Sequence, residues 1–167
     1  MSHTTILNEA GEVIGTQEFA EALEAGSIRA VSRVFIFNER GEVLLQKRTA
    51  NVLFPHTELE SAGGHVGPGE TFRETAENEL REELGIKTDL IEIAQNIRPT
   101  GEPCSGSVFK GTIDATQTEI TFDPKEVAGV RWITPDRLDE EIVSNTENFT
   151  PGFPEVWQRL RAKLVAS

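Results

Sequence analysis

The chain has 167 residues, of which 37% are hydrophobic and 26% are charged, which fits one ordinary globular domain and excludes a disordered chain. Its formal net charge of −12 excludes broad binding to a nucleic-acid duplex, since such binding requires a basic surface. No stretch approaches the roughly 20 apolar residues that cross a bilayer, the start lacks the pattern of a signal peptide, and the single cysteine, Cys104, allows no intrachain disulfide, so we expect a cytoplasmic protein with no membrane partner.

The first third of the chain predicts a hairpin, a short helix and two strands. Weak alternation of polar and apolar residues around a turn indicates the hairpin, and Gly26 is suited to end the helix. Two β-rich runs joined by a turn indicate the strands. These elements are expected at residues 4–16 (hairpin, with its turn at 8–11), 18–25 (helix), 31–37 and 43–48 (strands, joined at 38–41) and 50–60 (loop).

A glycine-rich loop is expected at 61–69, followed by a helix over 70–84. Glycine permits positive φ and a close approach of the backbone to a ligand. Thr71 and Glu74 have the spacing of a capping box, and Gly85 is suited to end the helix. The sequence therefore predicts a loop that leads directly into a helix of about four turns.

The C-terminal half predicts three more strands and two more helices. They are expected near residues 86–97, 107–113 and 127–133 (strands), from 135 (a short helix) and at 154–164 (the last helix). Thr134 is expected to cap the short helix, with Pro135 in its first turn. Strands mixed with a few helices predict an α+β fold, an α/β/α sandwich with a mixed central sheet. We expect the hairpin and short helix of 1–28 to pack on the domain formed by 29–167.

Acidic residues crowd the helix expected at 70–84. At about 100° per residue, Glu79, Glu82 and Glu83 fall within one arc of about 100° that borders the apolar face. Like charges at these spacings repel by a few tenths of a kcal/mol per pair, and a hard cation such as Mg²⁺ would neutralise them. The alternative interpretation is an ordinary solvated face, and the net charge taken alone favours that reading.

The same segment resembles the Nudix box, a 23-residue motif with nine fixed positions. Eight of the nine match at the correct spacing, and they are Gly64, Glu70, Glu79, Leu80, Glu82, Glu83, Gly85 and Ile86. The likeness extends over about residues 29–165, with Val130–Ile133 as a further family-like stretch. The resemblance implies the Nudix fold, with the N-terminal hairpin as an extension.

The resemblance also implies a metal-dependent hydrolase that cleaves a phosphoanhydride bond in a small nucleoside-diphosphate-linked or other diphosphate substrate. Glu79, Glu82 and Glu83 would hold one to three Mg²⁺ ions, or Mn²⁺ in their place. The carbonyl of Gly64 would be a further ligand. The proton of the attacking water would pass to a box glutamate, with Glu82 favoured over Glu79, or to Glu126, for which a plain turn residue is the alternative.

One box position departs from the family pattern, because Asn78 stands where the family has arginine. In the family this arginine pairs with the glutamate matched by Glu70 and helps to orient the metal-binding carboxylates. Asparagine can hydrogen-bond to Glu70 but supplies no bidentate charged fork. The site is expected to be weakened by this change, or else Arg73 or Arg81 substitutes.

A diphosphate substrate requires cationic side chains in the cleft. Arg33 lies in a strand with apolar neighbours on both faces, and Arg48 and Arg98 lie at strand ends, so these three are candidates. His65, in the glycine loop, is a further candidate for contact with phosphate. The alternatives are snorkelling or surface arginines and ordinary loop polarity.

Two other functions compete with hydrolysis. The sequence is similar to the isopentenyl-diphosphate isomerase-like branch, but Gly63 stands where the isomerase has its cysteine, and Arg29 falls near the position of an upstream metal histidine. An isomerase is therefore disfavoured. A non-catalytic diphosphate-binding module is the other alternative, which Asn78 favours and the retained glutamates oppose. The sequence leaves open whether the chain forms a homodimer.

Overall fold

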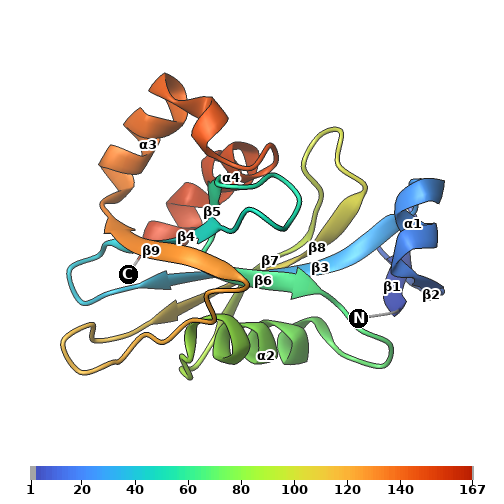
Figure 1. The fold of residues 1–167 in the computed structure, drawn as a ribbon, viewed down its shortest axis with the longest axis horizontal. Helices are drawn as coiled ribbons and strands as arrows, with labels where there is room; N and C mark the ends of the chain where they lie inside the picture. Colours follow the sequence, from blue (N-terminus) through green and yellow to red (C-terminus); the bar gives the residue numbers. More distant parts are fainter. Residues whose placement is uncertain (1–2, 167) are drawn as a thin grey trace.

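A computed structural model describes residues 3–166 (Figure 1). The strands in this part of the chain are β1 (His3–Leu7), β2 (Val13–Glu18), β3 (Ile28–Phe37), β4 (Val43–Arg48), β5 (Glu58–Leu59), β6 (Ala62–His65), β7 (Ile91–Ile97), β8 (Cys104–Thr112) and β9 (Val127–Ile133). The helices are α1 (Phe19–Ala25), α2 (Phe72–Leu84), α3 (Pro135–Ser144), α4 (Phe153–Val165) and the short 3₁₀ helix η1 (Thr146–Asn148). No helix among these residues is long and apolar enough to span a membrane.

Strand β3 organises the sheet, because four other strands pair with it. It runs antiparallel to β1, β4 and β6 and parallel to β8, while β4 also pairs with β5 and β9. All ten residues of β3 are buried, as expected for a strand that is covered on both faces. Val34 and Ile36 point to one face, and Phe35 and Phe37 point to the other.

Helices cover both faces of this sheet (Figure 1). On one face, α2 contributes Ala76, Leu80 and Leu84 to a core with the even-numbered side chains of β3. On the other face, α3 and α4 close a larger core that contains Leu138 and Trp157. The α+β class expected from the sequence, with a mixed sheet between helices, is confirmed.

The N-terminal hairpin and helix form as expected. Gly26 ends α1 with φ of 67°, a left-handed conformation that glycine adopts without strain. Strand β1 extends the main sheet, because Ile6 and Leu7 pair with Arg29 and Ile28 of β3. Residues 3–25 therefore continue the same sheet.

The sheet divides where β4 and β6 diverge along β3. Strand β4 pairs with the end of β3 at Phe37, whereas β6 pairs with residues 31–34. The buried Ser61 fills the fork, since its hydroxyl accepts from the Ile36 amide at 2.8 Å and donates to the Leu44 carbonyl at 2.6 Å. The opening between the two strands faces α2, since Gln46 of β4 and Gly63 of β6 both donate to Glu83.

Three expectations about local structure were wrong. The glycine loop expected at 61–69 begins as β6, because a bare Gly63 lets the strand approach β3; a Cβ there would lie 2.7 Å from the Ser32 carbonyl oxygen. The loop expected at 50–60 includes β5. The strand expected near 86–97 begins only at Ile91, since Ile86 instead packs under α2 after the helix ends.

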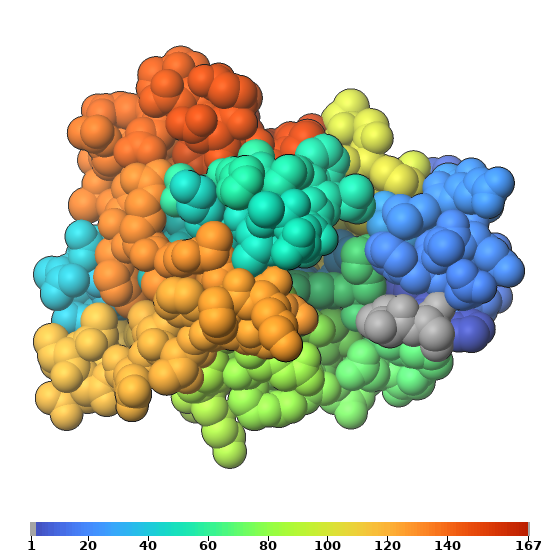
Figure 2. All heavy atoms as spheres, viewed as in Figure 1, coloured from blue at the N-terminus to red at the C-terminus, as the bar shows by residue number. Residues whose placement is uncertain are grey.

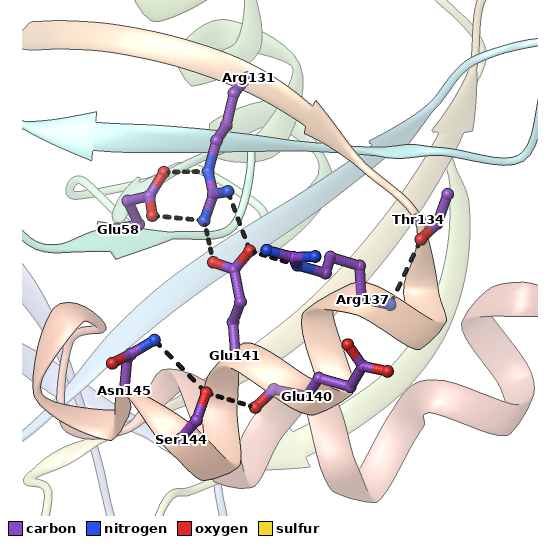
Figure 3. Close-up of polar contacts among 8 residues, drawn as sticks. All are labelled: Glu58, Arg131, Thr134, Arg137, Glu140, Glu141, Ser144 and Asn145. Carbon is purple, nitrogen blue, oxygen red and sulfur yellow. Dashed lines mark hydrogen bonds and ion pairs between the residues drawn. The ribbon is translucent and has the colours of Figure 1, made fainter.

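Strand β5 is held in place by a network around Arg131 of β9 (Figure 3). The Arg131 guanidinium donates to both carboxylate oxygens of Glu58, at 2.7 and 2.8 Å, and to Glu141 of α3 at 2.7 Å. Both carboxylates are largely shielded from solvent. One arginine therefore ties β5, and the residues that follow it, to β9 and α3.

Replacing Arg131 with methionine is expected to lower the free energy of unfolding by about 1 kcal/mol, because a partly exposed network contributes little more than this. In a chain of this length the midpoint of thermal unfolding should fall by roughly 2–4 °C. Arg137→Met is the matched control, since Arg137 is more exposed and contacts Glu141 alone. Circular dichroism would measure both changes, and equal midpoints for Arg131→Met and the wild type would contradict the assignment.

Candidate active site

The capping residues of α2 are those expected from the sequence. The Thr71 side chain accepts from the Glu74 amide, and the Glu74 carboxylate accepts from the Thr71 amide, both at 3.0 Å. Gly85 ends the helix with φ of 66°. The caps set where the helix begins and ends, and the buried face formed by Ala76, Leu80 and Leu84 fixes its rotation and so the direction in which each glutamate points.

Glu79 and Glu83 lie one helical turn apart and face the fork between β4 and β6. The Glu83 carboxylate accepts from the Gly63 amide and from the Gln46 side chain, both at 3.1 Å. Glu79 lies against Gly64, where a Cβ would stand only 2.6 Å from the Glu79 carboxyl carbon. The glycine pair thus makes room for two carboxylates at the same place.

Burial raises the pKa of Glu79 to about 7 and that of Glu83 to about 8, and the repulsion between acidic neighbours adds to the effect. No lysine or arginine within residues 3–166 forms an ion pair with either carboxylate. The two groups therefore form an acidic pair without an ion-pair partner, which is stabilised either by retained protons or by a cation.

Glu82 is placed differently from the other two expected ligands. Its side chain is 62% exposed, lies 3.9 Å from Arg81 and does not line the cleft. No group of three or more His, Cys, Asp or Glu side chains among the described residues is arranged to hold a metal ion. The structure thus brings together two of the three expected ligands, and Glu82 lies at the solvent edge of the helical arc.

Asn78 makes the contact expected of it. Its amide donates to Glu70 at 3.2 Å, and the second Glu70 oxygen accepts from the Gly67 amide at 2.7 Å. Arg81 donates to the side-chain Oδ1 of Asn78 at 3.2 Å rather than to Glu70. Arg73 instead donates to the Leu90 carbonyl. Neither arginine therefore replaces the missing box arginine directly, although Arg81 supports Asn78.

A cleft of about 620 Å³ opens beside the acidic pair. Figure 2 shows its mouth as a hollow between α1, the loop over 49–60 and the segment near 121–126, with β6 as the floor. Its lining includes the expected site residues Arg33, Arg48, Gly64, His65, Glu79, Glu83 and Glu126. Five further polar and aromatic residues, which were not expected from the sequence, also line the cleft: Phe19, Ser32, Gln46, Glu60 and Lys125.

Arg33 is buried, with 9% of its surface exposed, and it lines this cleft. Its guanidinium is 3.8 Å from Glu60 and 3.7 Å from Glu102, which is beyond hydrogen-bonding distance. Its Nη1 atom has no hydrogen-bond partner. Burial raises the pKa of Glu60, and the nearby Arg33 opposes this shift. The result is a buried donor with unused capacity beside a buried acceptor.

His65 is neutral in this site. Burial, followed by the charge of Arg29, lowers the pKa of His65 to about 4. Arg29 donates a hydrogen bond from Nη1 to His65 Nε2 at 3.1 Å. This nitrogen is therefore the acceptor, and it is not free to bind a cation. His65 therefore lines the cleft as an uncharged ring.

The remaining cationic candidates divide between the cleft and the surface. Arg48 lines the cleft, and burial lowers its pKa while Glu60 and Glu83 oppose that shift. Arg98 is instead bound to Glu9 at 2.8 Å and to the Glu102 carbonyl at 3.2 Å, outside the cleft lining. Arg98 was expected in the cleft because it lies at a strand end, but its side chain points away from the cleft, toward Glu9.

The raised pKa values of the acidic pair predict a pH dependence of stability in the metal-free protein. A carboxyl group whose folded-state pKa lies above its unfolded value destabilises the fold as pH rises between the two values. For Glu83 this window runs from the ordinary 4.5 to about 8. In a chelating buffer, Glu83→Gln should therefore gain stability relative to the wild type across this window. Urea unfolding at pH 5 and pH 8.5 measures it, and a constant difference would contradict the shift.

Comparisons with known proteins bear on this arrangement. A sequence model of the NUDIX domain matches residues 27–153. The isopentenyl-diphosphate Delta-isomerase of Nocardia farcinica is 31% identical over 160 residues, which covers 90% of each chain. A Nudix hydrolase of Deinococcus radiodurans is 32% identical over 149 residues, covering 83% of this chain and 82% of the relative. A crystal structure from the same organism matches with a TM-score of 0.81 and 26% identity, covering 95% of this chain and 98% of the other.

Proposed function

The chain belongs to the Nudix family, and we propose that it is a metal-dependent hydrolase that cleaves a phosphoanhydride bond in a small diphosphate substrate, such as a nucleoside-diphosphate-linked compound. The observation that carries the proposal is the acidic pair. Glu79 and Glu83 are partly buried, form no ion pair with a lysine or arginine of the described residues, and open to a cleft that also contains Arg33 and Arg48.

The donors at this position suit Mg²⁺, with Mn²⁺ as a substitute. Two carboxylates supply only hard oxygen ligands, and Mg²⁺ is usually held by one or two carboxylates together with substrate phosphates. Glu79 and Glu83 would hold the ion, and Gly64, which packs against Glu79, would offer its carbonyl. A divalent cation held there would neutralise phosphate charge and lower the pKa of a bound water.

The other cleft residues bind and orient the substrate. Arg33 and Arg48 supply positive charge for the phosphates, and Lys125 supplies more at the mouth. Water attacks phosphorus, the bond to the bridging oxygen breaks, and a phosphate or nucleotide leaves. Glu126 is our candidate for accepting the proton of that water, because it lines the cleft near Glu79. For Glu82, the role of metal ligand or general base stays a prediction from the resemblance to the Nudix box.

Isomerase activity is the second candidate, since several relatives bear that name. Two features of the cleft oppose it. Gly63 has no side chain to transfer a proton, and a Cβ there would meet the backbone of β3. Arg29 stands near the position of the upstream metal histidine, and its side chain donates to His65 Nε2, so this nitrogen is not free to bind a metal. The third candidate, a non-catalytic binding module, is opposed by the carboxylates of Glu79 and Glu83, which open into the cleft.

The proposal is tested by a screen of nucleoside di- and triphosphates, dinucleotides, nucleotide sugars and simple diphosphates, scored by phosphate release with and without Mg²⁺. Isopentenyl diphosphate is assayed in parallel for isomerisation. We expect Mg²⁺-dependent release from at least one diphosphate and no isomerisation. Isomerisation without hydrolysis would favour the second candidate, and binding without any turnover would favour the binding module.

Asn78→Arg is expected to raise activity or metal affinity by about tenfold or more. A guanidinium at this position, two turns after Glu70, would replace one hydrogen bond from a neutral donor with two from a charged donor, worth roughly 1.5–3 kcal/mol when partly buried. Asn78→Lys is the matched control, since it adds charge without the bidentate fork. Kinetics across a Mg²⁺ titration measure both variants. A loss of activity in Asn78→Arg would mean that Arg81, through Asn78, already serves this role.

A further inference from the structure

A second pocket, of about 440 Å³, lies against β4, β5 and β9 on the face of the sheet that points away from the cleft. We call it the β9 pocket. None of the described residues that line it also lines the cleft. Successive side chains of a strand point to opposite faces, so Lys47 points away from the cleft that its neighbours Gln46 and Arg48 line. The β9 pocket is therefore separate from the acidic pair, and its volume is within the usual range for small-molecule pockets.

A row of three paired residues forms the floor of the β9 pocket. Lys47 pairs with Glu58 on one side and with Gly129 on the other, so these three positions share one face of the sheet. Gly129 leaves the floor open, because a Cβ built there meets no described atom within 4 Å. Glu58 would be the natural counter-ion of Lys47, but its two carboxylate oxygens accept from Arg131 at 2.7 and 2.8 Å (Figure 3). Lys47 consequently forms no ion pair with any residue of 3–166.

Two further donors line the β9 pocket from outside the sheet. His56 comes from the loop over 49–60, and Asn148 comes from η1. The backbone of His56 holds a φ of 64°, which is uncommon outside glycine, and its amide donates to the Arg48 carbonyl at 3.2 Å. The amide of Asn148 donates to the Asn145 carbonyl at 2.9 Å. The two side chains make no hydrogen bond within the described part of the chain, so both are available to a ligand.

The charge of the β9 pocket is positive, although the whole chain has a formal net charge of −12. Arg131 and Arg137 balance Glu58 and Glu141, to which they are bound, and this leaves the ammonium group of Lys47 in excess. An ammonium group, an imidazole N–H and a side-chain amide are all donors that suit an oxyanion. A phosphate group offers three acceptor oxygens, one for each of these donors, whereas a carboxylate offers two.

We propose that the β9 pocket binds a phosphate group, either as free phosphate or as a small phosphate ester, through Lys47, His56 and Asn148. This inference goes beyond the proposed hydrolase function, because the β9 pocket shares no described residue with the cleft. Binding there needs neither the metal nor turnover.

The test follows the backbone amide resonances of the isotope-labelled full chain by nuclear magnetic resonance. Inorganic phosphate or glycerol phosphate is added in metal-free buffer at constant ionic strength, so that general screening does not change. Gly129 and Asn148 report on the β9 pocket, whereas Gly63 and Gly64 report on the cleft. We expect saturable shifts at Gly129 and Asn148. Tighter binding of inorganic phosphate would identify the free ion as the ligand, and tighter binding of glycerol phosphate would identify an ester.

Variants assign the binding to the proposed side chains. Lys47→Met should weaken phosphate binding at the β9 pocket by about fivefold or more, because it removes the charged donor. Gly129→Leu should abolish this binding by filling the open floor. Lys87→Met removes the same charge from an exposed lysine outside the β9 pocket and the cleft, so it is the matched control and should bind as the wild type does.

Three results would overturn the inference. They are shifts at Gly129 and Asn148 that rise linearly with phosphate, saturable shifts confined to Gly63 and Gly64, and equal phosphate affinity in Lys47→Met and Lys87→Met. Each of them would leave the proposed hydrolase function intact, since that function depends on the cleft alone.

Discussion

Glu83→Gln should lower kcat by at least about 100-fold, the size of loss seen when a main charge-stabilising element is removed. Glu83 is the more buried member of the acidic pair, and hydrogen bonds from Gly63 and Gln46 fix its position. Glutamine keeps the shape and these contacts' approximate geometry but removes the charge that a cation requires. Because burial disfavours the charged form of Glu83, the variant should be at least as stable as the wild type at neutral pH.

Steady-state kinetics at saturating Mg²⁺ measure this loss, with thermal unfolding as the check on folding. Glu77→Gln is the matched control, since Glu77 lies on the exposed side of the same helix and should leave kcat unchanged. Turnover within about threefold of the wild type in Glu83→Gln would place the reactive centre somewhere other than the fork between β4 and β6, because losing a main charge-stabilising element should cost far more.

Gly64→Ala should be nearly as damaging, although it changes no charge. A Cβ at this position would lie 2.6 Å from the carboxyl carbon and 2.9 Å from an oxygen of Glu79, so the carboxylate must move by about an ångström. A displacement of this size at a catalytic group can cost about 100-fold. The loss should appear in kcat and in metal affinity together, since both depend on where Glu79 points.

Gly129→Ala provides the comparison for that experiment, because a Cβ there meets nothing within 4 Å. It should behave as the wild type in both activity and unfolding temperature. If Gly64→Ala retained full activity with a normal Mg²⁺ requirement, the close contact between Gly64 and Glu79 would have no functional role, and Glu79 would not be a ligand.

The spacing of residues 70–85 was enough to predict the helix and its caps, because these features depend on local periodicity, which a sequence displays directly. The contact between Asn78 and Glu70 was expected from the resemblance to the Nudix box. Glu82 shows the limit of the same reasoning. A helical wheel places it beside Glu79 and Glu83, but the wheel does not show where the sheet opens, and the opening admits only two of the three side chains.

The features that the sequence did not predict all depend on long-range pairing. Glu60 meets Arg33 because β6 folds back along β3, and the glycines that permit this resemble an ordinary loop when read alone. Phe19 reaches the cleft because β1 places α1 beside His65. Arg98 was expected in the cleft from its position at a strand end, but the neighbouring Glu9 holds it at the surface.

The central claim is that Glu79 and Glu83 together bind a divalent cation that the reaction requires. The most direct measurement is a Mn²⁺ titration followed by electron paramagnetic resonance, comparing the wild type with the Glu79→Gln/Glu83→Gln double variant at pH 8. We expect the wild type to remove free Mn²⁺ from solution, Mg²⁺ to compete for the same site, and the double variant to bind at least about tenfold more weakly, a loss of about 1.4 kcal/mol or more. Equal Mn²⁺ affinity in the two proteins would contradict the claim.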